Sequence, residues 1–208
     1  MPTKTRNKIE SDKFILARLE ASEDFKGANF FDCGEDDLNE FFKEDAMYHK
    51  EHLLAETYFF QPIKATNEGL FYPVAFISFL NDHIPLTRKE RKTEKKSFWK
   101  DIKKHIPHKL SHYSTFPAVK IGRLGVHKDY QKNHIGSYLL NMTKEFFLTQ
   151  NRTGCRFITV DSYNNEVTIN FYKKNGFQFL WNEDKDENTR IMYFDLKRFK
   201  DQSKPILQ

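Results

Sequence analysis

From residue 121 to residue 140 the chain reads Ile-Gly-Arg-Leu-Gly-Val-His-Lys-Asp-Tyr-Gln-Lys-Asn-His-Ile-Gly-Ser-Tyr-Leu-Leu. The apolar and β-branched run 118–126 predicts a strand, and the polar run His127 to Asn133 predicts a turn. A helix is predicted next, from Ile135 to about Gln150. It is indicated by apolar residues at helical spacing, which are Ile135, Leu139, Met142 and Phe146.

The first turn of this predicted helix has the chemistry of an anion site. Its backbone N–H groups have no intrahelical acceptor, and the helix dipole is positive at this end, so a diphosphate suits it. The small residues Gly136 and Ser137 allow phosphate oxygens to approach the backbone closely. An ordinary strand-to-helix connection has the same form, so this stretch alone does not decide between the two readings.

Strands and helices alternate on both sides of this segment. Strands are predicted from apolar, β-branched and aromatic runs at Phe14 to Leu19, Thr57 to Phe60, Val74 to Leu80, Phe157 to Val160, Phe177 to Leu180 and Ile191 to Phe194. Helices are predicted at 35–50 and at 166–174, the second with Gly176 as its stop signal. The strand–helix–strand order of the C-terminal half indicates an α/β fold with a mixed (α+β) sheet and a parallel crossover.

The composition is that of a folded protein, with 21 Phe and 9 Tyr but only 8 Gly and 7 Pro. We expect one domain over residues 1–208, because this length suits a single hydrophobic core. No apolar run approaches the roughly 18 residues of a membrane span, and no apolar segment follows the charged N-terminus as in a secretory signal. A cytoplasmic location is therefore predicted. Cys33 and Cys155 are expected to be small semi-buried side chains that form neither a disulfide framework nor a metal site.

Residues 87–112 differ from the rest of the chain because they carry ten Lys and Arg and few apolar residues. The apolar residues Phe98, Trp99, Ile102 and Ile106 recur at roughly helical spacing, which predicts a basic amphipathic helix. We place it in an insertion at about 82–117. Its basic face either docks an acidic partner such as a nucleic acid or is ordinary solvated surface.

The turn resembles motif A of the GNAT superfamily of N-acetyltransferases, a Gln/Arg-x-x-Gly-x-Gly/Ala loop that follows a strand. Gln131, Gly136 and Ser137 match this motif, and His134 stands where the first Gly is usual. The resemblance implies a central mixed, twisted sheet of about six to seven strands flanked by helices. It also implies transfer of an acetyl group from acetyl-CoA to an amine, without a metal.

A second stretch, from Asn165 to Phe177, reads Asn-Glu-Val-Thr-Ile-Asn-Phe-Tyr-Lys-Lys-Asn-Gly-Phe. It resembles the family signature Asn-x-x-Ala-x-x-Phe-Tyr-x-x-x-Gly-Phe, with Thr168 in place of the usual Ala. In such enzymes the Asn contacts the CoA arm and the Tyr hydroxyl lies by its sulfur, so Asn165 and Tyr172 are expected to take these roles. The phenol of Tyr172, with an ordinary pKa near 10, is the candidate general acid for the departing thiolate.

The resemblance also implies which residues hold acetyl-CoA. The cofactor arm is expected along strand 121–126, where the N–H of Val126 or Leu124 polarises the thioester carbonyl. The predicted cofactor-binding residues are Leu124, Gly125, Val126, Gln131, Lys132, Asn133, His134, Ile135, Gly136, Ser137, Asn165 and Tyr172.

The general base is less evident than the acid. Glu56 and Asp161 are candidates by position, His127 and His134 by chemistry, and a water serves equally well. An α-amino group has a pKa near 7.7–8.0, against about 10.4 for a lysine side chain, and needs little base at neutral pH. This favours an aminoacyl or N-terminal acceptor.

An upstream match resembles one subgroup of the superfamily. The run Phe31-Asp32-Cys33-Gly34, with Leu38, Phe41 and Ala46 after it, is similar to the opening of a subgroup that includes toxins acetylating aminoacyl-tRNA. Three kinds of acceptor stay open: a small molecule, a protein or aminoacyl-tRNA. A homodimer, a non-catalytic regulatory protein that binds acyl-CoA and a nucleic-acid-binding module also stay open.

Overall fold

The computed structural model describes residues 14–20, 25–62, 72–85, 98, 115–150 and 154–202. The chain divides into two compact units, one comprising residues 1–80 and 122–141 and the other residues 81–121 and 142–208. Strands β3 (Ala75–Pro85) and β4 (Thr115–Val126) and helix α4 (Ile135–Thr149) contribute residues to both units. The sheet has seven strands in the order β1-β2-β3-β4-β5-β7-β6, which confirms the predicted mixed sheet.

The first unit begins with antiparallel strands. β1 (Phe14–Arg18) pairs with β2 (Glu56–Pro62), and β2 pairs with β3. Between β1 and β2 a 3₁₀ turn (Phe25–Phe30) leads to a helical stretch. This stretch consists of α1 (Asp36–Glu40), one π-helical segment (Phe41–Asp45) and α2 (Ala46–Glu51), so the helix predicted at 35–50 is confirmed with a widened turn at its centre.

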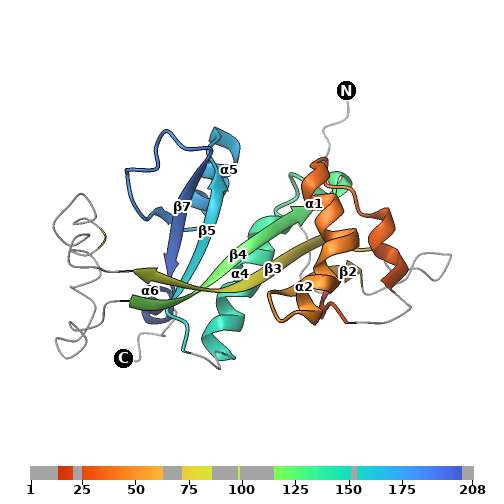
Figure 1. Ribbon diagram of the computed structural model, residues 1–208, viewed down its shortest axis with the longest axis horizontal. Helices are drawn as coiled ribbons and strands as arrows, with labels where there is room; N and C mark the ends of the chain where they lie inside the picture. The colour runs from red at the N-terminus through yellow and green to blue at the C-terminus, as the bar shows by residue number, and fades with distance from the viewer. Residues whose placement is uncertain are drawn as a thin grey trace. The chain divides into compact units, whose positions relative to one another are not determined.

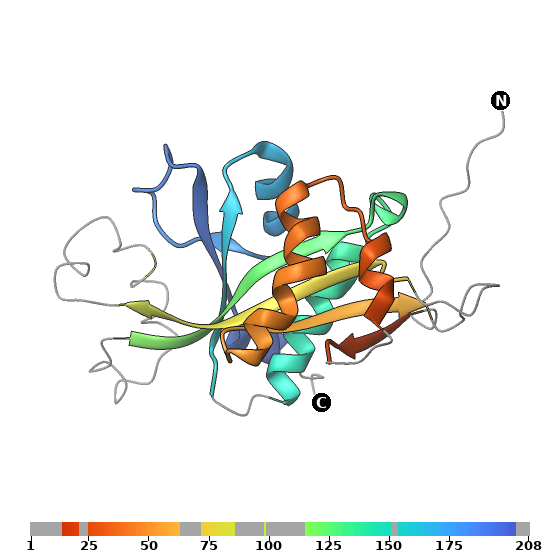
Figure 2. The same ribbon diagram turned by 45° about the vertical axis from the view of Figure 1, so that its right-hand side comes forward.

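The helical stretch crosses β2 and β3 (Figure 2) and buries aromatic side chains against them. Phe42 stacks on Phe76 with ring centroids 4.4 Å apart, and Phe31 meets Phe76 edge-on at 5.3 Å. Leu19, Phe31, Phe42 and Phe76 are at most 1% exposed. Burial of this much aromatic surface is the main stabilising contribution in this unit.

In the second unit β5 (Phe157–Tyr163) is parallel to β4 and antiparallel to β7 (Thr189–Asp195), beside which it runs in Figure 1. The short β6 (Gln178–Phe179) closes the edge, and α5 (Glu166–Lys174) packs on β5. The parallel pair confirms the predicted crossover. A C-terminal helix, α6 (Leu196–Gln202), follows β7 directly and was not predicted.

Phe98 is the part of the predicted basic helix that the structure describes. It is 3% exposed and meets Tyr193 edge-on at 4.8 Å, in a cluster with Phe116, Phe157 and Leu180. The remaining residues of that predicted helix lie outside the described residues. Strands β3 and β4 extend into the predicted insertion, to Pro85 and from Thr115.

Cys33 and Cys155, which were expected to be semi-buried, are both buried. Within the part of the chain that the structure describes, no helix has both the length and the apolar character needed to cross a bilayer. The same residues contain no group of three or more His, Cys, Asp or Glu side chains placed to hold a metal ion.

Candidate active site

The last part of β4, where the cofactor arm is predicted to lie, packs closely against side chains of β3. β4 pairs in parallel with β5, from the pair Ala118–Phe157 to the pair Ile121–Val160. Beyond it, a Cβ on Gly122 would lie 2.2 Å from the tip of Leu80, and a Cβ on Gly125 would lie 2.6 Å from the ring of Phe76.

Leu80 and Phe76 lie four residues apart on β3 and therefore share one face of the sheet. Gly122 and Gly125 lie three residues apart, so both meet that face only if β4 contains a one-residue irregularity between them. Such an irregularity redirects backbone N–H and C=O groups out of the ladder. The two glycines are also required sterically, because the neighbouring side chains occupy the Cβ positions.

Beyond β4 the chain makes a turn that side chains fasten to the backbone. The Gln131 amide donates from Nε2 to the carbonyl oxygens of Cys33, at 2.8 Å, and Val126, at 3.0 Å. The N–H of Lys128 donates to the carbonyl of Asp32 at 2.8 Å. The side chain of Gln131 therefore holds the turn, so a contact with a phosphate would come from backbone groups of the turn.

Two residues of this turn have left-handed backbone conformations without being glycine. Lys132 has φ 63° and His134 has φ 61°, and both side chains are exposed. A left-handed residue is disfavoured for any side chain with a Cβ, which explains why glycine is usual at the position of His134. Concave turns that contain left-handed residues aim successive N–H groups to one side, and this favours anions.

Helix α4 begins directly after the turn. Ile135 and Gly136 are buried in its first turn, and the N–H of Tyr138 already donates to the carbonyl of His134 at 2.9 Å. The N–H groups at the start of this 15-residue helix have no intrahelical acceptor and lie at the positive end of its dipole. The predicted residues from Leu124 to Ser137 are thus brought together in one strand–turn–helix segment.

Asp32 and Asn39, which were not among the predicted site residues, hold the same turn from the other side. The Asp32 carboxylate accepts from Lys128 Nζ at 2.6 Å and from the Gly34 N–H at 2.9 Å, and the Asn39 Oδ1 accepts from the Cys33 N–H at 2.9 Å. The hydrogen bond from Lys128 lowers the pKa of Asp32 to about 2. The run Phe31-Asp32-Cys33-Gly34 was the signal that marked this loop.

Helix α5, in the second unit, carries the other two predicted site residues. Asn165 is its N-cap, and its side-chain oxygen accepts from the Thr168 N–H at 2.8 Å. This bond gives Asn165 a role in the fold and leaves its amide NH₂ to donate elsewhere.

The other end of α5 explains the rest of the motif. The Gly176 N–H donates to the Lys173 carbonyl and the Phe177 N–H to the Tyr172 carbonyl, both at 3.0 Å, which is a Schellman motif. Gly176 supplies its left-handed residue at φ 84°, and the apolar contact of the motif is Phe177 against Tyr172, with ring centroids 5.3 Å apart.

Tyr172 is 6% exposed, and burial raises the pKa of its phenol above the usual value. The phenol is therefore protonated throughout the neutral range and remains able to donate a proton.

Three of the four candidate bases, Glu56, Asp161 and His127, are held by other groups, and His134 is exposed. Glu56 forms a two-point ion pair with Arg18, with Nε–Oε2 at 2.8 Å and Nη2–Oε1 at 2.5 Å, which lowers the pKa of Glu56. Asp161 is ion-paired with Lys120. The Nδ1 of His127 accepts from the Asp129 N–H at 3.3 Å and caps a 3₁₀ turn.

Comparisons with known proteins agree with these motifs. Residues 104–179 match the family model of the acetyltransferase (GNAT) domain. No curated protein sequence gives a match.

Three solved structures are similar to the chain along almost all of its length. AtaT complexed with acetyl-methionyl-tRNAfMet is 22% identical with a TM-score of 0.67, and the match covers 92% of this chain and 99% of AtaT. A Tyr-to-Phe mutant of the AtaT toxin bound to acetyl-CoA and the C-terminus of the antitoxin AtaR is 18% identical, with a TM-score of 0.63 and coverage of 93% and 99%. A Tyr-to-Phe mutant of KacT is 19% identical, with a TM-score of 0.67 and coverage of 91% and 99%.

At these identities the solved structures show a shared fold. The family model adds the acetyltransferase domain, in which both sequence motifs lie from Gln131 onward as far as Phe177. The chain thus matches the acetyltransferase (GNAT) domain over residues 104–179 and shares the fold of the AtaT and KacT structures.

Proposed function

We propose that this acetyltransferase transfers the acetyl group of acetyl-CoA to the α-amino group of an aminoacyl-tRNA. The observation that carries the chemistry is the strand–turn–helix segment from Leu124 to Ser137, whose backbone suits a diphosphate. The acceptor is supported by the fold shared with AtaT, whose structure contains acetyl-methionyl-tRNAfMet. It is also supported by the low basicity of an α-amino group, which needs no strong base.

In this proposal, N–H groups between Gln131 and Ser137 bind the diphosphate of acetyl-CoA. The side chains of Lys132 and His134 are exposed, so the binding is assigned to the backbone of the turn. Backbone groups of Gly122 to Val126 pair with the amides of the pantetheine arm. The N–H of Val126 or Leu124 stabilises the oxyanion that forms on the thioester carbonyl.

The neutral amine attacks the thioester carbon, the carbon–sulfur bond breaks, and the thiolate takes the hydroxyl proton of Tyr172. The amine releases its own proton to water, and the phenolate recovers one from the same source. Asn165 donates from its free amide NH₂ to the CoA arm.

Water is proposed as the base because the carboxylate candidates are engaged. Glu56 is neutralised by Arg18, and Asp161 by Lys120. A lowered carboxylate pKa makes Glu56 a weaker proton acceptor still. An α-amino acceptor can react without a strong base because much of it is already neutral, whereas a lysine side chain would have to lose a proton first.

The test uses radiolabelled acetyl-CoA and a tRNA pool charged with amino acids in vitro. We expect label in the tRNA fraction, and N-acetyl amino acid after alkaline release from the tRNA. Uncharged tRNA and free amino acids are the controls and should remain unlabelled. Label on polyamines or proteins instead would overturn the acceptor, and acetyl-CoA binding without transfer to any amine would favour the regulatory alternative.

Other partners and the location stay predictions. A cytoplasmic location follows from the proposed acceptor. An acidic partner at the predicted basic helix and a homodimer rest on sequence alone, because most of that helix lies outside the described residues.

A further inference from the structure

A buried lysine lies at the C-terminal end of α5, the helix that carries Tyr172. Lys144 belongs to the part of α4 that lies in the second unit and is 4% exposed. Its Nζ donates to the backbone carbonyl of Asn175 at 2.8 Å. Asn175 is the C-cap of α5, so the lysine bonds one of the carbonyl groups that the helix itself leaves without a donor.

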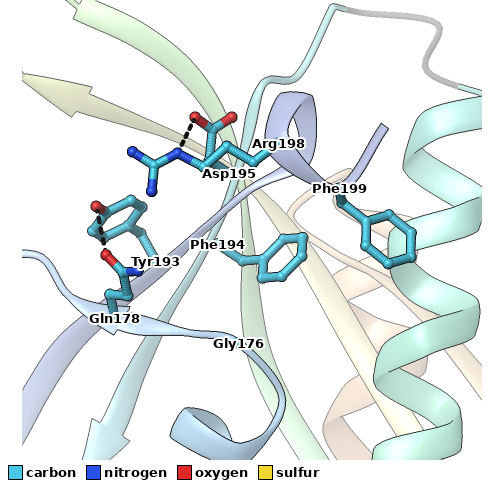
Figure 3. Close-up of a pocket in the computed structure, with 7 residues that line it drawn as sticks. All are labelled: Gly176, Gln178, Tyr193, Phe194, Asp195, Arg198 and Phe199. Atoms are coloured by element: carbon cyan, nitrogen blue, oxygen red, sulfur yellow. Dashed lines mark hydrogen bonds and ion pairs between the residues drawn. The ribbon is translucent and has the colours of Figure 1, made fainter. Parts of the chain in front are cut away.

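The surroundings of this ammonium group are mainly aromatic. Nζ lies 4.5 Å from the ring centroid of Phe194 and 5.8 Å from that of Phe199, and the two rings are 5.8 Å apart. Figure 3 shows both rings side by side in a pocket of about 210 Å³ that Gly176 also lines. A Cβ on Gly176 would lie 3.0 Å from the Phe194 ring, so Phe194 packs directly on the cap of α5.

Asn175 connects Lys144 to the last turn of α5, which contains Tyr172. Its N–H donates to the carbonyls of Phe171, at 3.2 Å, and Tyr172, at 3.0 Å, and its side-chain Nδ2 donates to the Phe171 carbonyl at 2.8 Å. The last turn of α5 is thus closed through Asn175, and Tyr172 is part of that turn. A cation at a helix C-terminus is favoured by the helix dipole.

We propose that Lys144 is a positioning residue for acetyl transfer: its ammonium group anchors the Asn175 cap and thereby fixes the Tyr172 hydroxyl for proton donation. The inference rests on the proposed role of Tyr172. It assigns no contact between Lys144 and the substrate.

The environment of Lys144 disfavours its charged form. Burial lowers the pKa of Lys144 to about 8, whereas an unfolded lysine has a pKa near 10.4. The folded state therefore binds fewer protons than the unfolded state between these values, and stability rises with pH across that window. At neutral pH burial of the charged form costs free energy of folding, and the hydrogen bond to Asn175 and the contacts with the two rings offset part of it.

Charged groups of both signs lie on the elements around Lys144. They are Glu145 on α4, Glu166, Lys173 and Lys174 on α5, Arg190 and Asp195 on β7, and Lys197, Arg198, Lys200 and Asp201 on α6. Lys174 is exposed and carries the same charge near the same helix end. Lys174→Met is therefore the matched control for Lys144→Met, a change that keeps the length of the side chain and removes its charge.

The first test measures kcat and KM for acetyl-CoA with the amine acceptor that supports turnover. We expect Lys144→Met to lower kcat about 10-fold with KM within about 2-fold of wild type, and Lys144→Arg to recover most of kcat. Lys174→Met should match wild type. The melting temperature of Lys144→Met at pH 7 should equal or exceed that of wild type, which separates positioning from loss of structure.

The second test separates this inference from the assignment of Tyr172. In the Tyr172→Phe background, Lys144→Met should add little further loss of kcat, because the group it positions is gone. If Tyr172→Phe alone leaves kcat unchanged, the acid assignment fails. If Tyr172→Phe is slow but Lys144→Met turns over at the wild-type rate, only the positioning role is overturned.

A third test, by ¹⁹F NMR, does not require the amine acceptor. In protein labelled with 3-fluorotyrosine, the ¹⁹F resonance of Tyr172 is identified by its absence in Tyr172→Phe. Lys144→Met should move or broaden this resonance, while Lys174→Met should leave it in place. An unchanged resonance in Lys144→Met would contradict the inference directly.

Discussion

The turn between β4 and α4 differs from helix α5 in how its motif is held, although the sequence marks both. The turn is exposed, contains two left-handed residues that are not glycine, and is fastened by Gln131 to the carbonyls of Cys33 and Val126. Helix α5 is regular and is closed at both ends by its own motif residues, Asn165 and Gly176. In the turn the motif residues shape the backbone, whereas in α5 they cap the helix that carries the buried side chain of Tyr172.

This difference predicts separate consequences of mutation. Changes in the turn should alter the affinity for acetyl-CoA, and changes at Tyr172 should alter the rate of the chemical step. Four variants test the division, in order of expected effect.

The largest effect is expected for Tyr172→Phe. The change removes one buried hydroxyl and keeps the packing on Phe177. We expect kcat to fall about 100-fold, the range for one general acid, with the Kd for acetyl-CoA nearly unchanged. Steady-state kinetics and calorimetry measure the two quantities, and a wild-type kcat would mean that water or another group protonates the thiolate.

Gly136→Asp should act on affinity instead. A carboxylate in the first turn of α4 would meet the diphosphate, and we expect the Kd for acetyl-CoA to rise more than tenfold, or about 1.4 kcal/mol. Circular dichroism must show that the variant is folded, because Gly136 is buried. Gly136→Ala controls for added volume without charge. Equal affinities of a folded Gly136→Asp and wild type would remove the diphosphate from this turn.

Gln131→Met tests the fastening of the turn rather than the binding surface. It deletes two hydrogen bonds to backbone carbonyls, each of which contributes roughly 0.5–1.5 kcal/mol. We expect the Kd for acetyl-CoA to rise about 5-fold because the turn is less ordered before binding. Gln131→Glu places acceptor oxygens opposite two carbonyl oxygens, so its Kd for acetyl-CoA should be higher than that of Gln131→Met. The opposite order would indicate that the side chain faces the cofactor.

The smallest effect is expected for His134→Gly. Glycine adopts the φ of 61° without the Cβ strain but loses more backbone entropy, so we expect a change in unfolding free energy below about 1 kcal/mol. The Kd for acetyl-CoA should stay within about 3-fold of wild type, since the backbone makes the contact. A much weaker binding of the Gly variant, measured by calorimetry, would show that the imidazole itself contacts the cofactor.

The sequence predicted the parts of the fold whose pattern is local. The strands at 118–126 and 157–160, the helix from Ile135 and the ends of α5 follow from periodicity and capping residues, and each is confirmed. Helix α6 was missed because its seven residues include only two apolar ones, Leu196 and Phe199, and because it continues directly from a strand.

The contacts that support the site are distant in sequence. Lys128 reaches Asp32 across 96 positions and Gln131 reaches Cys33 across 98, so no local pattern reveals either bond. The aromatic surroundings of Lys144 likewise come from β7 and α6, which a helical period on α4 does not predict. The motifs marked the groups proposed to meet acetyl-CoA, and the fold supplies the groups that hold them.

The most direct test of the central claim compares Gly136→Asp and Tyr172→Phe in single-turnover acetyl transfer, with acetyl-CoA raised to saturation. If the turn binds and α5 performs the chemistry, Gly136→Asp approaches the wild-type rate at saturation, while Tyr172→Phe stays about 100-fold slower. The claim is contradicted if Tyr172→Phe recovers at high acetyl-CoA, or if a saturated and folded Gly136→Asp remains as slow as Tyr172→Phe.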